Sequence, residues 1–349
     1  STPGFPEFSQ DSNSFSSEVP SAHGRANNSS SKLKRPLRMR ILILASWYPD
    51  KQKPGRGIFF REQAEALAAV GHVVTVMVPE RRSPRRYLSL ENKRLRSEHG
   101  FEACDENEVR VYRNRATRFL PAGLFPILVL REFERDALEF IETLMAERGP
   151  FDIIHAQSVY WAGAIAMAMA DRLDVPYIIQ EHRSNFLSGS FGKKTMSVIK
   201  EAFDRASYIV AVSEGLLAAL RKASGVPTER SAVLPNMVNA IFFRRTPRSR
   251  SKVFRFGMVA GLVPIKRHDL ALYAFKRILE TRNEVELHLA GEGPSRRFLE
   301  NLSRDLGIQE KVTWHGHQSR EEVVDLFNGL DALLLASDHE TFGIVLAEA

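Results

Sequence analysis

The sequence predicts an α/β protein with two Rossmann-like domains, the second of them incomplete. Three observations support this prediction. The chain has 349 residues, which is enough for two domains that each bury a core. Short apolar runs alternate with amphipathic stretches, a pattern typical of a parallel sheet covered by helices. The polar, basic segment 243–252 interrupts the alternation and is typical of a domain linker.

The expected first domain covers residues 39–242. Its strand candidates are short apolar runs, and its helix candidates are longer segments with an apolar stripe. The expected strands are 40–46, 72–79, 109–113, 152–156, 175–180 and 207–212. The expected helices are about 58–70, 123–147, 160–173, 192–205 and 213–224.

The expected second domain covers residues 253–349 and repeats the alternation. In chain order its elements are strand 254–260, helix 267–281, strand 285–290, helix 294–306, strand 311–315, helix 319–330, strand 331–336 and a helix that begins near 342. The chain stops at Ala349, inside that last helix, and a doubly wound domain normally has more than four strands. We therefore expect this domain to be incomplete and residues 1–349 to be inactive alone.

Residues 1–38 precede the first expected strand. They are rich in Ser, Asn and Pro and end in the basic run KLKRPLR, so we expect a disordered N-terminal extension. No apolar segment follows these charges, which argues against a signal peptide. We expect that Met39 is the natural start, or that the tail is an upstream extension of little catalytic relevance.

Composition narrows the function classes. No stretch reaches the roughly 18 apolar residues of a membrane helix, and the lone Cys104 cannot form an internal disulfide, so we expect a protein of the reducing cytoplasm. No Cys/His cluster has metal-ligand spacing. The net charge of +7 favours a polyanionic partner: nucleic acid, an acidic membrane or a phosphate-bearing substrate. No nucleic-acid motif accompanies the charge, so nucleic acid is not expected.

Several candidate residues follow strands of the first domain, where ligands bind in open α/β sheets. Gly55 and Gly57 precede a helix and could admit a phosphate to the backbone, although a flexible connection explains them equally well. His182 follows the strand that ends at Gln180, which places a titratable imidazole at this edge. We interpret His155 as structural.

In the second domain, Lys266 lies at the start of a helix, where a cation could face a diphosphate. Arg267 competes with it for this role, and either could be a solvated surface charge. The turn 291–294 leads into another helix, with a tight turn as the simplest explanation.

The segment SDHETFGIVLAE at 337–348 is the most specific. Eight helical residues would separate Glu340 from Glu348 by roughly 12 Å, a span that suits two polar groups of one extended ligand. It is too long for two carboxylates that share a proton.

These two residues form a Glu-x7-Glu motif that resembles the signature of the group 1 family of retaining glycosyltransferases. The resemblance covers residues 39–349, and further matching segments occur in the family's order. They are GHVVTV at 71–76, DIIHAQ at 152–157, EHRSN at 181–185, VAVSEGL at 210–216, LPNMVNAIF at 234–242, LVPIKRHD at 262–269, AGEGP at 290–294 and WHGHQSREE at 314–322.

The resemblance implies a GT-B fold, in which two Rossmann-like domains face each other across a cleft. It implies that the first domain holds the acceptor and the second a nucleotide-diphosphate sugar of UDP or GDP type. It also implies transfer with retention of anomeric configuration, without a metal or other cofactor. The sequence contains no Asp-x-Asp motif, which agrees with that expectation.

By the same resemblance, Glu340 contacts hydroxyls of the transferred sugar, Glu348 contacts the ribose, and Lys266 neutralises the diphosphate. His182 faces the sugar and assists transfer. The remaining implied donor contacts are Gly57 and Arg267, the turn residues Gly316 and His317, and the backbone around Phe342, Gly343, Ile344 and Val345. Charge that builds on the departing diphosphate would be stabilised by this arrangement.

The sequence departs from the family pattern at Gly261, where many relatives have a phosphate-binding arginine five residues before the lysine. This weakens the electrostatic clamp unless Arg267 substitutes for it. Asn239 and Gln157 replace a common Asp and a common His, without a functional conclusion.

The loop after the first strand resembles enzymes that build cell-surface polysaccharides, whose acceptors are glycans or lipid-linked. The basic stretch 81–96 and the segment 118–133 are compatible with peripheral attachment to an anionic inner membrane surface. We favour a solvated loop and a core helix. Two alternative functions stay open: a catalytically dead, binding-only relative and a nucleotide-sugar epimerase of the same fold.

Overall fold

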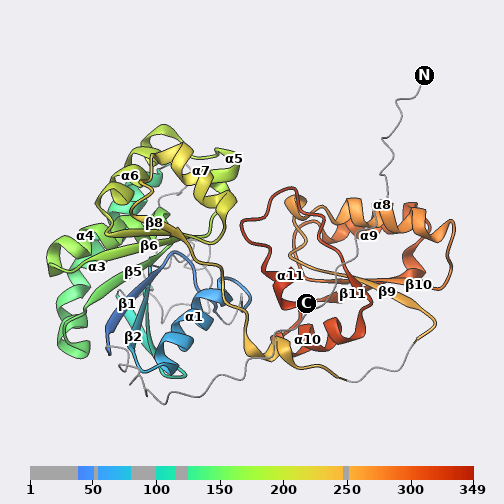
Figure 1. Ribbon diagram of the computed structural model, residues 1–349, viewed down its shortest axis with the longest axis horizontal. Helices are drawn as coiled ribbons and strands as arrows, with labels where there is room; N and C mark the ends of the chain where they lie inside the picture. Colours follow the sequence, from blue (N-terminus) through green and yellow to red (C-terminus); the bar gives the residue numbers. More distant parts are fainter. Residues whose placement is uncertain (1–37, 51–53, 80–99, 115–124, 247–250) are drawn as a thin grey trace, which may run out of the picture. The chain divides into compact units, whose positions relative to one another are not determined.

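The computed structural model describes residues 38–50, 54–79, 100–114, 125–246 and 251–349 (Figure 1). Residues 1–37 of the expected N-terminal extension and the basic stretch 81–96 lie outside these residues. Residues 38–349 form one compact unit by their contacts. No helix among the described residues is long and apolar enough to cross a membrane.

The first part of the chain forms an eight-stranded sheet. Its strands are β1 (Arg40–Ala45), β2 (Val73–Val78), β3 (Phe101–Glu106), β4 (Val109–Asn114), β5 (Ile153–Gln157), β6 (Tyr177–Glu181), β7 (Tyr208–Ala211) and β8 (Ser231–Val233). Their order is β3-β4-β2-β1-β5-β6-β7-β8, and only the β3–β4 pair is antiparallel.

Helices cover both faces of this sheet because alternate strand residues point to opposite sides. Ile41 and Ile43 of β1 pack with α1 (Ile58–Ala69), and Leu42 and Leu44 pack with the helices of the other face. Those helices are α3 (Pro126–Arg148), α4 (Ala164–Leu173), α6 (Lys193–Arg205) and α7 (Glu214–Ser224), with the short α5 (Asn185–Ser188) beside α7.

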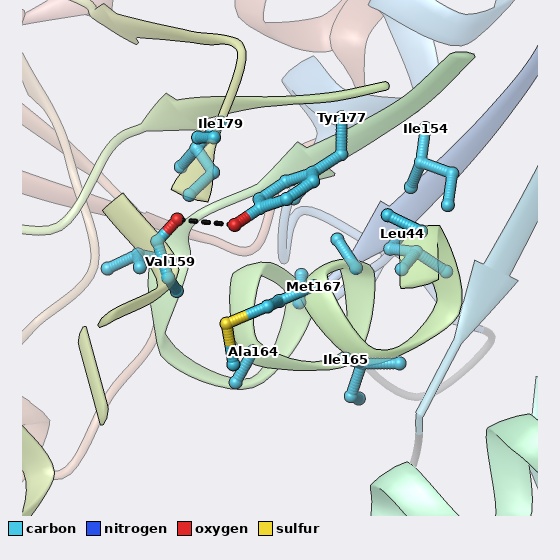
Figure 2. Close-up of a cluster of buried hydrophobic side chains, with 14 of the residues drawn as sticks. Leu44, Ile154, Val159, Ala164, Ile165, Met167, Tyr177 and Ile179 are labelled. Carbon is cyan, nitrogen blue, oxygen red and sulfur yellow. Dashed lines mark hydrogen bonds between the residues drawn. The ribbon is translucent and has the colours of Figure 1, made fainter. Parts of the chain in front are cut away.

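The larger core lies between β1, β5 and β6 and this second layer of helices (Figure 2). Leu44, Ile154 and Ile179 from the strands are completely buried there. The Tyr177 hydroxyl is also within this core and donates a hydrogen bond of 2.7 Å to the Ala202 carbonyl, so its polar end is satisfied.

The second part of the chain forms a four-stranded parallel sheet in the order β11-β10-β9-β12. Its strands are β9 (Phe254–Val259), β10 (Val285–Ala290), β11 (Val312–Gly316) and β12 (Ala332–Leu333). Its core includes residues of α8 (His268–Leu279) and α9 (Arg296–Asp305), which pack against each other. The chain continues through α10 (Arg320–Gly329) to α11 (Ile344–Glu348).

The structure confirms the α/β class with two parallel-dominated sheets, and the expected elements are present within a few residues. Strands β3 and β8 were not predicted from the sequence. The first is an edge strand with mostly polar, partly exposed residues, and the second has only three residues. The strand expected at 331–336 was too long, since β12 has two residues. The described part of segment 118–133 is mostly helical, and Val129, Leu130 and Phe133 are buried in the core.

Candidate active site

Two sheet edges meet the requirement for a ligand site in an α/β protein. Ligands bind beyond the carboxyl ends of parallel strands, where connections run to opposite sides of one strand. In the first sheet β1 has β2 on one side and β5 on the other. In the second sheet β9 has β10 on one side and β12 on the other. The predicted site residues follow strands of these two sheets: β6, which precedes His182, lies two strands from β1, and β11, which precedes His317, lies two strands from β9.

Glu181, the last residue of β6, organises the edge of the first sheet. The side chain is fully buried. Its Oε1 accepts hydrogen bonds from the Ser158 hydroxyl at 2.5 Å and from the backbone N–H groups of His182 and Arg183 at 2.8 Å. Its Oε2 accepts one from the Val159 N–H at 2.8 Å. A carboxylate with four donors fixes the segment after β5 against the end of β6.

That segment has an unusual backbone. Ser158 and Trp161 both have φ of 74°, a region that residues other than glycine seldom adopt. The Ser46 hydroxyl donates to the Tyr160 carbonyl at 2.6 Å and accepts from the Ala162 N–H at 3.1 Å. These bonds, together with those of Glu181, offset the conformational cost and hold one fixed loop at the sheet edge.

His182 is buried directly beyond this loop. Its Nε2 lies 2.9 Å from Gln157 Oε1, and an amide oxygen can only accept, so Nε2 carries the proton. Its ring centroid lies 5.1 Å from that of Phe59 and 4.8 Å from that of Phe60. Burial, with a smaller contribution from His155, lowers the pKa of His182 to about 3. The imidazole is therefore neutral near pH 7.

His155 lies deeper in the same polar network. Gln157 Nε2 donates to Gln63 Oε1 at 2.6 Å, and Gln63 Nε2 donates to Gln180 Oε1 at 2.9 Å. His155 Nε2 lies 3.3 Å from Gln157 Nε2, and burial lowers the pKa of His155 to about 4. This buried, hydrogen-bonded position agrees with the structural role expected from the sequence.

Gly57 occupies a position that only glycine fits. Its φ is 72°, and a Cβ placed there would lie 2.6 Å from Cδ1 of the Trp47 ring. It directly precedes α1 and no side chain caps that helix, so the backbone N–H groups of the first turn face the loop.

Lys266 and Glu340 are brought together at the edge of the second sheet. Lys266 Nζ lies 2.5 Å from Glu340 Oε1, although 74 residues separate them in sequence. Both side chains are about a quarter exposed, at 27% and 25%. This is a partly solvated ion pair, so an anionic ligand can compete with Glu340 for the ammonium group.

Arg267 points to other partners. It is held in the left-handed region with φ of 52°, and its guanidinium binds Asp269 through Nε and Nη2 at 3.1 Å. Nη1 binds Asp338 at 3.1 Å. These two carboxylates raise the pKa of Arg267 above its usual value. The substitution of Arg267 for the missing arginine at Gly261 stays a prediction.

The segment that follows Glu340 corrects one expectation from the sequence. The last helix begins at Ile344, so the eight residues from Glu340 to Glu348 are not all helical and the spacing of roughly 12 Å does not apply. Gly343 precedes this helix with φ of 71°. Phe342 packs against the core of the first sheet, while Ile344 and Val345 form the first turn.

Glu348 has a partner that the sequence analysis missed. Arg320 Nη1 lies 2.5 Å from Glu348 Oε1, and Arg320 Nη2 lies 2.8 Å from Glu62 Oε2. Asn239 Nδ2 donates to the same Glu62 at 3.2 Å. Burial raises the pKa of Glu348, and Arg320 offsets part of this effect. Separations of 28 and 258 residues left no local signal for these contacts.

The expected base-binding turn lies at the end of β11. Gly316 has φ of 70°, and a Cβ there would lie 3.0 Å from Glu292 Oε1. His317 is exposed, and its Cε1 lies 3.8 Å from where a Cβ on Gly55 would be. The glycine loop after β1 and the turn after β11 therefore approach each other.

The structure thus joins Lys266 to Glu340 and brings Gly55 close to His317. It does not place Glu348 in contact with Glu340, and the described contacts of His182 are with residues of the first sheet and its helices. Within the described ranges, no group of three or more His, Cys, Asp and Glu side chains could hold a metal ion.

Two family models match consecutive parts of the chain. The family described as "Glycosyl transferase 4-like domain" matches residues 55–237, and the family described as "Glycosyl transferases group 1" matches residues 240–349. TuaC of Bacillus subtilis, named as a teichuronic acid biosynthesis glycosyltransferase, is 24% identical over 89% of this chain and 78% of its own length. A glycogen synthase of Mycobacterium tuberculosis is 25% identical over 89% of this chain and 75% of its own length.

Solved structures share the fold. A sucrose-phosphate synthase from Thermosynechococcus elongatus superimposes with a TM-score of 0.67 at 17% identity and covers 88% of this chain and 78% of its own. HepE from Anabaena, in complex with UDP-glucose, gives 0.60 at 20% identity and covers 89% and 78%. With the first family matching more than half of the chain, the protein belongs to the group 1 family of GT-B glycosyltransferases.

Proposed function

We propose that the protein transfers a sugar from a nucleotide-diphosphate sugar of UDP or GDP type to a glycan or lipid-linked acceptor. The transfer retains the anomeric configuration and needs no metal or other cofactor, and it serves the synthesis of cell-envelope polysaccharide. Peripheral contact with an anionic membrane is part of this proposal. The relatives in teichuronic acid synthesis and in complex with UDP-glucose support the substrate classes.

The ion pair between Lys266 and Glu340 is the observation that carries the proposal. Departure of a nucleoside diphosphate builds negative charge on its phosphates, and a fixed ammonium group stabilises that charge. Since Nζ already lies 2.5 Å from a carboxylate oxygen, a diphosphate oxygen can replace it at the same place. Glu340, once released, accepts hydrogen bonds from hydroxyls of the transferred sugar.

The remaining donor contacts follow the same logic. Glu348 binds the ribose hydroxyls, the backbone from Phe342 to Val345 faces the phosphates, and Gly316 with His317 lies near the base. Gly57 admits the phosphates from the first domain because no side chain fits at its position. Arg267 can bind the donor only if donor phosphates replace Asp269 and Asp338 as partners of its guanidinium group.

His182 contributes from the first domain as a neutral group. With Nε2–H donated to Gln157, Nδ1 carries the lone pair and can accept a hydrogen bond from a sugar hydroxyl. A neutral imidazole also leaves the charge balance of the leaving diphosphate to Lys266. Its part in transfer is therefore to orient the sugar.

A thermal-shift screen with UDP, GDP, ADP and their common sugar conjugates tests donor binding, because a ligand that binds the folded state raises the melting temperature. We expect a shift with one nucleotide family. Glu348→Ala should abolish the shift, and Glu321→Ala, on the exposed first turn of α10, should keep it. No shift with any nucleotide in a folded protein would contradict donor binding.

An assay of sugar transfer distinguishes an active enzyme from a catalytically dead, binding-only relative. It would bind the donor without transferring or hydrolysing the sugar. With an active protein, NMR of the new linkage reports whether the anomeric configuration is retained, and activity in excess EDTA reports on metal dependence. Interconversion of the free nucleotide sugar, without transfer, would favour the epimerase.

A further inference from the structure

A cavity of about 600 Å³ opens at the edge of the second sheet, beside the ion pair described above. It lies between the loop that follows β9 and the first turn of α9, and Asp338 borders it from the loop after β12. Helices α8 and α9, which frame it, lie side by side (Figure 1). Lys266, Glu340 and Glu348 do not line it, and of the proposed donor contacts it shares Arg267.

One wall of the cavity is apolar. Phe298 projects from the first turn of α9 and is 61% exposed, which is unusual for a ring of this size on a helix. Val263, Pro264 and Ile265 from the loop continue this wall. Ligand pockets of this volume typically combine such a surface with a few fixed polar groups.

The polar groups are Asp269, Asp338 and the arginine between them. Arg267 binds both carboxylates at 3.1 Å, which holds both of them beside one guanidinium group. Each carboxylate still has lone pairs that can accept from hydroxyl groups. Two carboxylates against one guanidinium leave the group with a net negative charge, which disfavours a phosphate or other anion.

His268 supplies the independent indication of a ligand. It lines the cavity, is only 2% exposed, and neither of its ring nitrogens has a hydrogen-bond partner. Burial lowers the pKa of His268 to about 4, so near neutral pH the ring offers one donor and one acceptor. A buried polar group without a partner requires an explanation, and a bound hydroxylated molecule provides one.

We propose that this cavity binds a neutral sugar unit, with the pyranose ring stacked on Phe298 and its hydroxyls bound by Asp269, Asp338 and His268. A sugar matches the site because one molecule presents both an apolar C–H face and several hydroxyl groups that donate and accept. One part of this proposal rests on the proposed function: the statement that the sugar unit belongs to a glycan acceptor.

Ligand-observed NMR tests the site with methyl glycosides of glucose, galactose, mannose and N-acetylglucosamine, in the presence of saturating UDP. We expect saturable binding of at least one glycoside. Phe298→Ala and Asp338→Asn should each weaken it about tenfold or more, because they remove the stacking surface and one hydroxyl acceptor. The control is Phe254→Ala, a 44% exposed ring at the amino end of β9, on the opposite edge of the sheet.

The outcomes separate this site from the donor site. Glycoside binding that survives both cavity substitutions, or that Phe254→Ala abolishes equally, would overturn the proposal, as would no saturable binding of any of the four glycosides. Competition by inorganic phosphate would also contradict a neutral ligand. The UDP-induced thermal shift, measured on the Phe298→Ala variant, should be unchanged. If glycosides bind but UDP causes no thermal shift in the wild-type protein, the proposed function would be contradicted and the sugar site would still be supported.

Discussion

The polar groups at the two sheet edges of this protein differ in burial. At the edge of the first sheet, Glu181 and His182 are buried, and Glu181 binds four donors. At the edge of the second sheet, Lys266 and Glu340 form a pair that is about a quarter exposed. The first edge is therefore a fixed scaffold, because a buried polar network is costly to break. The second can exchange partners at low cost, as a donor-binding site requires.

The largest expected effect is on stability, at the first edge. Glu181→Ala leaves the Ser158 hydroxyl and three backbone N–H groups without their acceptor, so the free energy of unfolding should fall by about 3–5 kcal/mol. Urea denaturation measures it. The control is Glu142→Ala, which removes an exposed ion pair with Arg172 and should cost less than about 1 kcal/mol. An equal fall in the free energy of unfolding for the two variants would show that Glu181 stabilises the fold no more than an exposed ion pair does.

The next effect is on catalysis, at the second edge. Lys266→Ala should lower kcat by about 10²–10³-fold, because in the proposed mechanism Lys266 is the cation that stabilises the leaving diphosphate. Stability should change little, since the pair is partly solvated. Lys276→Ala, in the last turn of α8, the helix that follows Lys266 in the chain, is the matched control and should keep full activity. A Lys266→Ala enzyme with normal kcat would remove the main support for the proposed mechanism.

The third prediction concerns pH and again the first edge. The pKa values of His155 and His182 are about 4 and about 3 when folded, below the ordinary value of 6.5. Between pH 6.5 and the folded pKa values, each imidazole is protonated in the unfolded chain but not in the folded protein. The stability that comes from keeping the two imidazoles neutral is therefore fully present above pH 6.5 and is lost as the pH falls. Each imidazole should cost about 2 kcal/mol by pH 5.

His155→Gln sharpens this test because it removes one of the two groups. Urea denaturation from pH 7 to 5 should give a shallower loss of stability for the variant than for the wild type. The same slope for both proteins would show that the buried His155 is not the source of the acid sensitivity.

The smallest expected effect concerns Gly57, which directly precedes α1. Gly57→Ala combines a left-handed backbone with a Cβ 2.6 Å from the Trp47 ring, and should cost about 2 kcal/mol. Gly225→Ala has nearly the same φ, 70°, with no atom within 4 Å of the added Cβ, and should cost about 1 kcal/mol. Thermal unfolding compares the two. A smaller loss for Gly57→Ala would mean that the Trp47 ring moves aside freely.

Much of the fold could be predicted from the sequence, because strand and helix patterns depend on residues close together in the chain. The alternation of short apolar runs with amphipathic stretches implied a parallel sheet covered by helices, and in the structure Ile41 and Ile43 of β1 face one core while Leu42 and Leu44 face the other. Strands β3 and β8 were missed because pairing with neighbouring strands, and not their own apolar pattern, makes them strands.

The sequence by itself determined the fold class, the family and the order of the motifs that carry Lys266, Glu340 and Glu348. Only the tertiary structure decided which groups meet: Lys266 with Glu340, Arg320 with Glu62 and Glu348, and His268 with Asp338 around one cavity. The physical reason is distance along the chain. A local pattern reports on neighbours within a turn or two of helix, whereas the Arg320–Glu62 contact joins residues 258 positions apart and exists only once both sheets have formed.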